Sequence, residues 1–139
     1  MKPMDEKKRE AFLAKTRLGI LTTLTLDGAP TAVPIWFDWD GTAVSIFTDK
    51  SSQKVKRLQN DPRASMLVVN DIGEPEAWIL FEGKIEIKDV DTSELMTKLA
   101  HRYWDMTPPE TQAVLQDWLD HADQRCLLHL KPEKIRSLG

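Results

Sequence analysis

The sequence predicts a mostly β, α+β fold in which about six antiparallel strands form a small, strongly bent sheet or barrel with peripheral helices. Runs rich in β-branched residues are separated by Asp27-Gly28 and Asp40-Gly41, dipeptides that are typical of hairpin turns. Polar stretches with helical spacing lie between the later strands. A length of 139 residues, with 41% hydrophobic and 29% charged side chains, suits a single domain over residues 1–139.

The first half of the chain is expected to begin with a short amphipathic helix and to continue as a three-stranded meander. Helix-forming residues occupy 5–15. Strands are expected over residues 19–26, 31–39 and 42–48, joined by the two Asp-Gly turns. Because Pro34 cannot donate a ladder hydrogen bond, its strand should lie at a sheet edge or be bulged at this residue.

The second half of the chain mixes strands with helices, and its acidic helices should pack outside the sheet. Ser51 is expected to cap a helix that ends at Asp61-Pro62. Gly83 should mark a bend or bulge in a long strand, and Pro132 should close the last strand. The expected elements are helices at 51–60, 91–103 and 107–120, and strands at 64–69, 77–88 and 126–130.

Charge is distributed unevenly along the chain. The formal net charge of −3 argues against a general nucleic-acid-binding protein, which needs a broad cationic surface. Residues 48–63 contain five basic and two acidic side chains, whereas residues 89–123 contain eight acidic and two basic side chains. A small anionic ligand is therefore expected at the first segment and not at the second.

Cysteine use and hydropathy indicate a cytoplasmic protein. The single cysteine, Cys126, excludes an internal disulfide and a multi-cysteine metal centre. The longest apolar runs, at 65–69 and 77–81, are much shorter than the ~18 residues of a membrane-spanning helix. Residues 1–10 alternate acids and bases and lack the apolar core of a secretory signal. We therefore expect no membrane crossing and no secretion.

A predicted strand end and helix start, at residues 46–54, place hydroxyl groups and a cation close together. Thr48, Ser51, Ser52 and Lys54 combine hydroxyl donors and an ammonium with the free amides of a helix N-terminus, and these groups bind phosphate. An ordinary capped surface helix with solvated lysines accounts equally well for the spacing. The pattern is not a P-loop, because the glycine-rich run is missing.

Few side chains in the sequence point to catalysis by the protein itself. His101, His121 and His129 lack the short spacing of metal ligands, and no serine nucleophile motif occurs. Trp36 and Trp39 lie on the same predicted strand. A tryptophan beside a phosphate site can stack on a flat heterocycle, although tryptophan in a small domain more often fills the core. Any chemistry is therefore expected to come from a bound cofactor and not from a metal site.

Several motifs in the same order resemble the pyridoxamine 5'-phosphate oxidase-like, flavin-binding split β-barrel family. The resemblance covers residues 16–87 and extends more loosely to Leu138. The motifs that carry it are Leu24-Thr25-Leu26-Asp27-Gly28-Ala29-Pro30, Val33-Pro34-Ile35-Trp36-Phe37, Phe47-Thr48 followed by Ser52-Gln53-Lys54, Asn60-Asp61-Pro62-Arg63-Ala64-Ser65, and Phe81-Glu82-Gly83-Lys84.

The resemblance implies a six-stranded split barrel that forms a homodimer with two cofactor sites between the subunits. The phosphate of flavin mononucleotide (FMN) would bind Thr48, Ser52 and Lys54, and the backbone of residues 34–36 would face the flavin ring. Trp78 or Trp104 would reach the ring from the partner subunit. The full set of candidate cofactor-binding residues is Pro34, Ile35, Trp36, Phe47, Thr48, Lys50, Ser51, Ser52, Lys54 and Arg57.

Within this family the sequence resembles the general reductase branch more closely than the true pyridoxamine phosphate oxidases. Gln53 stands beside Lys54 where those oxidases favour arginine. The implied function is hydride transfer between FMN and a small planar substrate. Two alternatives share the fold: a reductase that uses the deazaflavin coenzyme F-420, whose anionic tail Lys50, Lys54, Lys56 and Arg57 would bind, and a non-enzymatic flavin-binding sensor or carrier.

Overall fold

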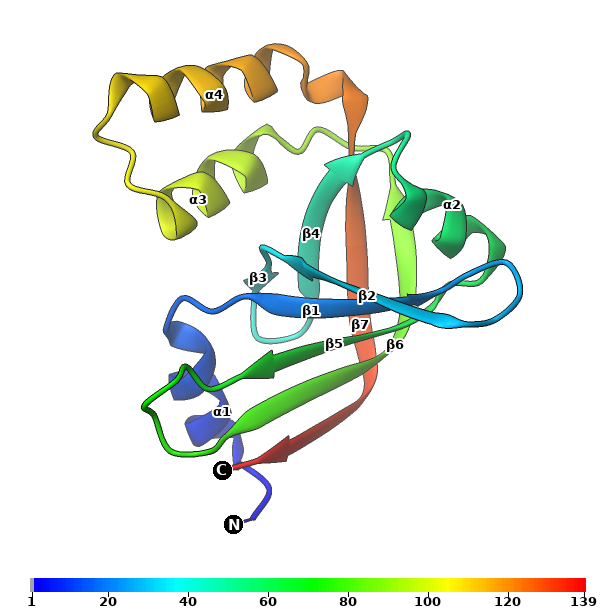
Figure 1. Ribbon diagram of the computed structural model, residues 1–139, viewed down its shortest axis with the longest axis vertical. Coiled ribbons are helices and arrows are strands. Elements are labelled where there is room, and N and C mark those ends of the chain that lie inside the picture. Colours follow the sequence, from blue (N-terminus) through cyan, green and yellow to red (C-terminus); the bar gives the residue numbers. More distant parts are fainter. Residues whose placement is uncertain (1) are drawn as a thin grey trace.

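The computed structural model describes residues 2–139, which form a curled antiparallel sheet with helices around it (Figure 1). The helices are α1 (Glu6–Ala14), α2 (Gln53–Asn60), α3 (Ser93–Tyr103), α4 (Pro109–Asp120) and the short 3-10 helix η1 (Ala122–Gln124). The strands are β1 (Gly19–Leu24), β2 (Pro30–Ile35), β3 (Asp38–Trp39), β4 (Val44–Asp49), β5 (Arg63–Val69), β6 (Trp78–Lys88) and β7 (Arg125–Leu138).

The sheet has the strand order β2-β1-β5-β6-β7-β4-β3, and all neighbouring strands are antiparallel. In Figure 1, β1 and β2 cross β4 and β7. Side chains from β1, β4 and β7, including Leu21, Ile46 and Leu128, belong to one buried cluster. The sheet therefore folds back over its own inner face, and the predicted class of a mostly antiparallel split barrel is confirmed.

Two expectations about the first strands are wrong. The sheet has seven strands and not six, because the expected strand at 31–39 is divided into β2 and β3 at Trp36 and Phe37. These two strands lie at opposite edges of the sheet, so no meander forms. The curl brings the two edges close enough for two residues to connect them. Pro34 lies on the edge strand β2, as its missing N–H predicts.

The bend at Gly83 is confirmed, but Pro132 does not end the last strand. The β6–β7 register shifts between Glu82 and Gly83, and Gly83 pairs with Pro132 at that shift. A proline is tolerated there because a bulge interrupts the ladder hydrogen bonds. A Cβ on Gly83 would lie 3.1 Å from the carbonyl oxygen of Lys131, so a larger residue would require the neighbouring backbone to shift slightly.

The core has two parts. Most buried side chains fill the inside of the curled sheet, and Phe81 is the largest that is fully buried. A smaller cluster of Met96, Ala100 and Leu115 joins α3 to α4 outside the sheet, as expected for the acidic helices. Partly buried aromatic residues pack against it and face the barrel. None of the helices within residues 2–139 is long and apolar enough to cross a membrane.

Candidate functional site

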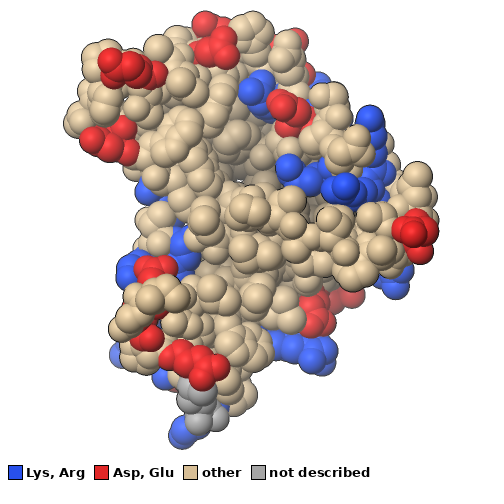
Figure 2. Space-filling model, in the orientation of Figure 1, with Lys and Arg blue, Asp and Glu red and all other residues tan. Residues whose placement is uncertain are grey.

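A small pocket of about 200 Å³ lies where the α3–α4 hairpin meets the barrel. Figure 2 shows a hollow between this hairpin and the sheet, with Lys and Arg atoms over α2 at its edge. The walls come from the end of β2, from β4, from α2 and from the hairpin. The lining residues are Ile35, Trp36, Ile46, Phe47, Lys54, Trp104 and Trp118.

Aromatic rings dominate the wall of this pocket. Trp36 lies parallel to Tyr103, with ring centroids 5.1 Å apart and an interplanar angle of 2°. Trp104 meets Trp36 edge-on at 4.7 Å and 89°. Trp118 lies 6.0 Å from Trp36 at 56°, and 5.7 Å from Phe47. Such a wall suits a flat, apolar ring, because aromatic pairs favour offset-stacked and edge-to-face contacts.

The pocket tryptophans differ from Trp39 in their hydrogen bonding. The indole N–H of Trp39 donates to the Glu10 carboxylate at 3.0 Å. The indole N–H groups of Trp36, Trp104 and Trp118 have no acceptor among residues 2–139 and are not fully buried. These three donors are available to a ligand that carries acceptors.

The polar end of the site is built by β4 and the start of α2. Thr48 is 8% exposed, and its hydroxyl donates to the Ser52 hydroxyl at 3.3 Å. Ser52 caps α2 by accepting from the amide of Val55. The expected cap, Ser51, is one residue too early, because Ser51 forms part of the turn between β4 and the helix. The Ser52 hydroxyl hydrogen is left free to donate.

Lys54 follows the cap by two residues and lines the pocket, where it is half-buried. In the described chain no carboxylate lies within 4.0 Å of its ammonium. The first amides of α2 have no intrahelical acceptor, and this end of the helix carries partial positive charge. The polar end of the site therefore presents donors and positive charge, a combination that favours an anion.

Tyr103 fastens the aromatic wall to the barrel. Its hydroxyl donates to the carbonyl oxygen of Arg17 at 2.6 Å and accepts from the amide of Phe37 at 3.4 Å. Burial raises the pKa of Tyr103, so the phenol stays protonated at neutral pH and serves as an anchor. Arg102 strengthens the attachment by donating to the carbonyl oxygen of Leu13 at the end of α1.

Four of the ten predicted site residues line the pocket, and two more form a hydrogen-bonded pair at the adjoining start of α2. Ile35, Trp36, Phe47 and Lys54 are the lining residues. Thr48, near the end of β4, donates a hydrogen bond to Ser52, the N-cap of α2, and both residues are close to Lys54 in the sequence. Pro34 is exposed on β2, one residue before the lining begins. Arg57 is half-buried in the last turn of α2, and Ser51 is exposed.

Lys50 has a different environment from the other candidates. Its ammonium pairs with the Asp89 carboxylate at 2.8 Å, and this hydrogen bond raises the pKa of Lys50. The pair belongs to a separate, charged depression that is also lined by Asp91 and Arg125. Nothing in the local sequence distinguishes Lys50 from Lys54, because Asp89 comes from the distant end of β6.

The sequence pattern gave no indication of Trp118 or Ile46 as lining residues. Trp104 was expected to reach the ring from the partner subunit. In the structure it lines the pocket of its own chain, beside Trp36. Trp78 lies elsewhere, opposite Val69 and Leu138 in the sheet. The only local signal for Trp118 is its place in the apolar stripe of α4 with Leu115, which indicates packing and not a ligand site.

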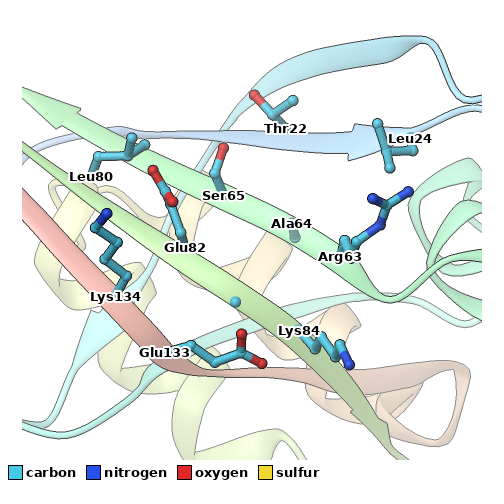
Figure 3. Close-up of a pocket in the computed structure, with 11 residues that line it drawn as sticks. Thr22, Leu24, Arg63, Ala64, Ser65, Leu80, Glu82, Lys84, Glu133 and Lys134 are labelled. Carbon is cyan, nitrogen blue, oxygen red and sulfur yellow. The ribbon is translucent and has the colours of Figure 1, made fainter.

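A larger groove, of about 550 Å³, lies on the outward face of the sheet (Figure 3). Thr22, Ser65, Glu82 and Lys134 occupy matching register positions on four adjacent strands along it. Glu82 already pairs with Arg136 at 3.0 Å. The groove has no aromatic lining, so the smaller pocket is the better candidate for a ring-binding site despite its size.

The curled sheet with its peripheral helices defines a split-barrel protein. The sequence pattern of the family described as Pyridoxamine 5'-phosphate oxidase matches residues 5–139. The chain therefore belongs to this family. No curated protein matches the sequence.

Solved structures with the same fold include a reductase, a conserved hypothetical protein and a putative oxidase. An F-420 reductase is 25% identical, with a TM-score of 0.71 over 91% of this chain and 94% of that chain. A conserved hypothetical protein from Mycobacterium tuberculosis is 25% identical, with a TM-score of 0.76 over 98% and 85%. A putative pyridoxamine 5'-phosphate oxidase from Listeria innocua is 18% identical, with a TM-score of 0.69 over 96% and 97%.

Proposed function

We propose that this protein is an oxidoreductase that binds FMN and exchanges a hydride with a small planar substrate. The observation that carries the proposal is the half-buried Lys54, whose ammonium has no counter-ion among residues 2–139 and lies beside an aromatic pocket. A partly desolvated cation without a partner favours an anionic ligand. Family membership supports the same conclusion.

The residues at the polar end fit a phosphate group. The Lys54 ammonium supplies a charge-assisted hydrogen bond, the Ser52 hydroxyl supplies a second donor, and the start of α2 supplies free amides. Thr48 orients Ser52 through their hydroxyl pair. Each of these groups acts as a donor, which is the requirement for holding a dianion.

The apolar end has side chains that suit contact with a flat ring. Trp36 offers an aromatic face, and Ile35 and Ile46 exclude water from the floor of the pocket. A bound flavin supplies hydride transfer by itself. Lys54 is the only ionisable side chain in the lining, so the chain's own contribution is to bind, orient and desolvate.

We also propose that the protein is a homodimer with cofactor sites shared between the subunits. Ile20, Leu67 and Leu80 occupy matching register positions on β1, β5 and β6, and their side chains alternate with the inward-facing core residues. Leu18 and Val69, which border this row, are 51% and 44% exposed. An apolar sheet face of this kind favours coverage by a second subunit, and Trp78 at its border would extend toward the partner's site.

The deazaflavin coenzyme F-420 is the second candidate. Lys56 and Arg57 continue the positive charge of Lys54 along α2, and no carboxylate in the described chain pairs with either. A longer anionic tail would use these cations. The F-420 reductase that shares the fold at 25% identity supports this alternative.

An absorbance spectrum of the purified protein, followed by parallel titrations with FMN and with the deazaflavin coenzyme, tests the proposal. Flavin bands, and release of FMN on denaturation, would support the first candidate. A colourless protein that binds only the deazaflavin, with strong salt dependence, would support the second. Binding of FMN without turnover of any reduced cofactor would indicate a sensor or carrier, and failure to bind either coenzyme would refute the proposal.

A cytoplasmic location is part of the same proposal. Cys126 is buried and unpaired, which suits a compartment that keeps thiols reduced. Burial also raises the pKa of the Cys126 thiol, so the residue is a poor nucleophile at neutral pH. Fractionation of cells that express the tagged protein would test this location.

A further inference from the structure

The aromatic pocket is narrower than the ring that is proposed to enter it. Its volume of about 200 Å³ is below the roughly 300–1,000 Å³ of ordinary ligand pockets. The ring centroids of Trp36 and Trp118 are 6.0 Å apart, and the two planes are inclined at 56°. A flat ring stacked between two parallel aromatic faces needs about 7 Å, because each contact takes about 3.5 Å. A ring that stacks between Trp36 and Trp118 therefore requires one of the two indoles to move.

Trp36 and Trp104 are held in place by polar contacts nearby. Tyr103, stacked on Trp36, donates to the Arg17 carbonyl oxygen at 2.6 Å. The backbone amide of Trp104 donates to the carbonyl oxygen of Ala100 at the end of α3. The same end of α3 is tied to α1 through Arg102. Movement of the end of α3 as a unit would break the hydrogen bonds of Arg102 and Tyr103 to the rest of the chain.

Helix α4 has no comparable polar attachment within the described chain. Its side-chain hydrogen bonds are local, from Gln112 to the carbonyl oxygen of Met106 and from Gln116 to the Asp120 carboxylate. The helix is held by its two chain ends and by apolar side chains, chiefly Leu115 and Trp118. It can shift without breaking a hydrogen bond to another helix or strand.

We propose that Trp118 is the movable, ring-binding wall of the pocket, where its indole stacks on a planar fused-ring heterocycle that lies against Trp36. The inference rests on the proposed function, because it names the ring-binding partner at that same site. The indole N–H groups of Trp36, Trp104 and Trp118 make no hydrogen bond within residues 2–139, so a ring with carbonyl or ring-nitrogen acceptors at its edge would pair with any of them that faces it. The ligand class is thus planar, with acceptors at the edge of the ring.

Calorimetric titration of three variants with FMN and with riboflavin, which has the ring but no phosphate, tests this role. We expect Trp118→Ala to raise Kd for both ligands by the same factor, about tenfold or more, since stacking of a base on an aromatic side chain is typically worth about 5- to 150-fold. Trp118→Phe, which keeps a smaller ring, should raise Kd about threefold. The control is Val114→Ala, because Val114 lies one turn earlier on α4 and outside the pocket lining. It should change neither Kd.

The outcomes separate this inference from the proposed function. A wild-type protein that binds both ligands, with no change in the folded Trp118 variants, would overturn the role of Trp118 and leave the proposed function standing. Riboflavin binding that depends on Trp118, without any gain from the phosphate of FMN, would support Trp118 and refute the phosphate site. Failure of the wild type to bind either ligand would overturn both. Circular dichroism shows whether each variant folds. If Trp118→Ala does not fold, the Kd values of Trp118→Phe test the role of Trp118.

Hydrogen exchange measures the movement directly. Amides of α4 should exchange faster than those of α3 in the free protein, because α4 has the weaker attachment. Saturating riboflavin should slow exchange in α4 more than in α3. Equal exchange of the two helices, unchanged by riboflavin, would show that α4 is a fixed wall and would overturn the proposal.

Discussion

Lys54 is the residue whose environment bears most directly on ligand binding. Its ammonium lines the pocket without a counter-ion in the part of the chain that the structure describes, whereas Lys50 is already paired with Asp89. Replacing Lys54 with alanine removes a charge-assisted contact worth about 1.5–3 kcal/mol. We expect the Kd for FMN to rise tenfold or more in a calorimetric titration, with the Kd for riboflavin unchanged.

Lys56→Ala is the matched control for this prediction. Lys56 is exposed on the same helix and does not line the pocket. Its substitution removes the same charge from α2 and should alter FMN affinity by less than the Lys54 variant. Equal losses in the two variants would show that only the general positive charge of α2 matters.

Glu74 connects the loop after β5 to Arg17, which is 6% exposed. Two hydrogen bonds from the Arg17 guanidinium, followed by one from the Asp71 amide, lower the pKa of Glu74 from 4.5 to about 2. Because the folded pKa is the lower one, ionised Glu74 stabilises the fold above about pH 4.5, and this stability is lost as the pH falls toward 2.

Glu74→Gln should therefore lower Tm at neutral pH and make Tm fall less steeply on acidification than in the wild type. Thermal melts followed by circular dichroism across the acidic range measure both effects. Glu76→Gln is the control, since Glu76 is exposed and has no ion pair within residues 2–139. A wild-type pH profile for Glu74→Gln would contradict the assigned role of the Arg17 pair.

Helix α2 is the element that forms the polar end of the site, and its cap is the most local feature of that site. Ser52 accepts a hydrogen bond from Val55, and its hydroxyl also receives one from Thr48. Loss of such a cap typically costs about 1 kcal/mol. We expect Ser52→Ala to lower the free energy of unfolding by this amount in urea and to weaken FMN binding.

Ser51→Ala distinguishes the observed cap from the one that the sequence pattern favours. Ser51 is exposed and makes no side-chain hydrogen bond in the described structure. Its substitution should leave stability within about 0.5 kcal/mol of the wild type. A larger loss for Ser51→Ala than for Ser52→Ala would contradict the cap assignment.

At the scale of the whole molecule, the outward sheet face determines the proposed assembly. Leu67 is at the centre of the apolar row formed with Ile20 and Leu80. We expect sedimentation to show a dimer for the wild type and a monomer for Leu67→Lys, because a buried unpaired charge is strongly unfavourable at an interface. FMN affinity should fall together with dimer formation if the sites are shared.

Val114→Lys is the control for this substitution. Val114 is 42% exposed and lies on α4, whereas the apolar row lies on β1, β5 and β6. The Val114→Lys variant should remain dimeric. A wild-type protein that sediments as a monomer would refute the proposed dimer. If Leu67→Lys still forms a dimer, the interface does not lie on this sheet face.

The polar end of the site could be predicted from sequence because it is local. Thr48, Ser52 and Lys54 lie within one strand–turn–helix unit, where backbone geometry brings neighbours in sequence together. The aromatic wall could not be predicted in the same way. Trp36 follows β2, whereas Trp104 follows α3 and Trp118 lies on α4, so their contact depends on how α3 docks on the barrel.

By itself, the sequence determined the two Asp-Gly turns, the placement of Pro34 at an edge or a bulge, the bend at Gly83 and the closeness of Thr48, Ser52 and Lys54, because turn chemistry and side-chain alternation act over a few residues. Only the tertiary structure decided that β2 and β3 lie at opposite edges of the sheet, that Asp89 forms an ion pair with Lys50 and that Trp118 lines the pocket. These features depend on the closure of the curled sheet and on packing between segments far apart in the chain, which no local pattern encodes.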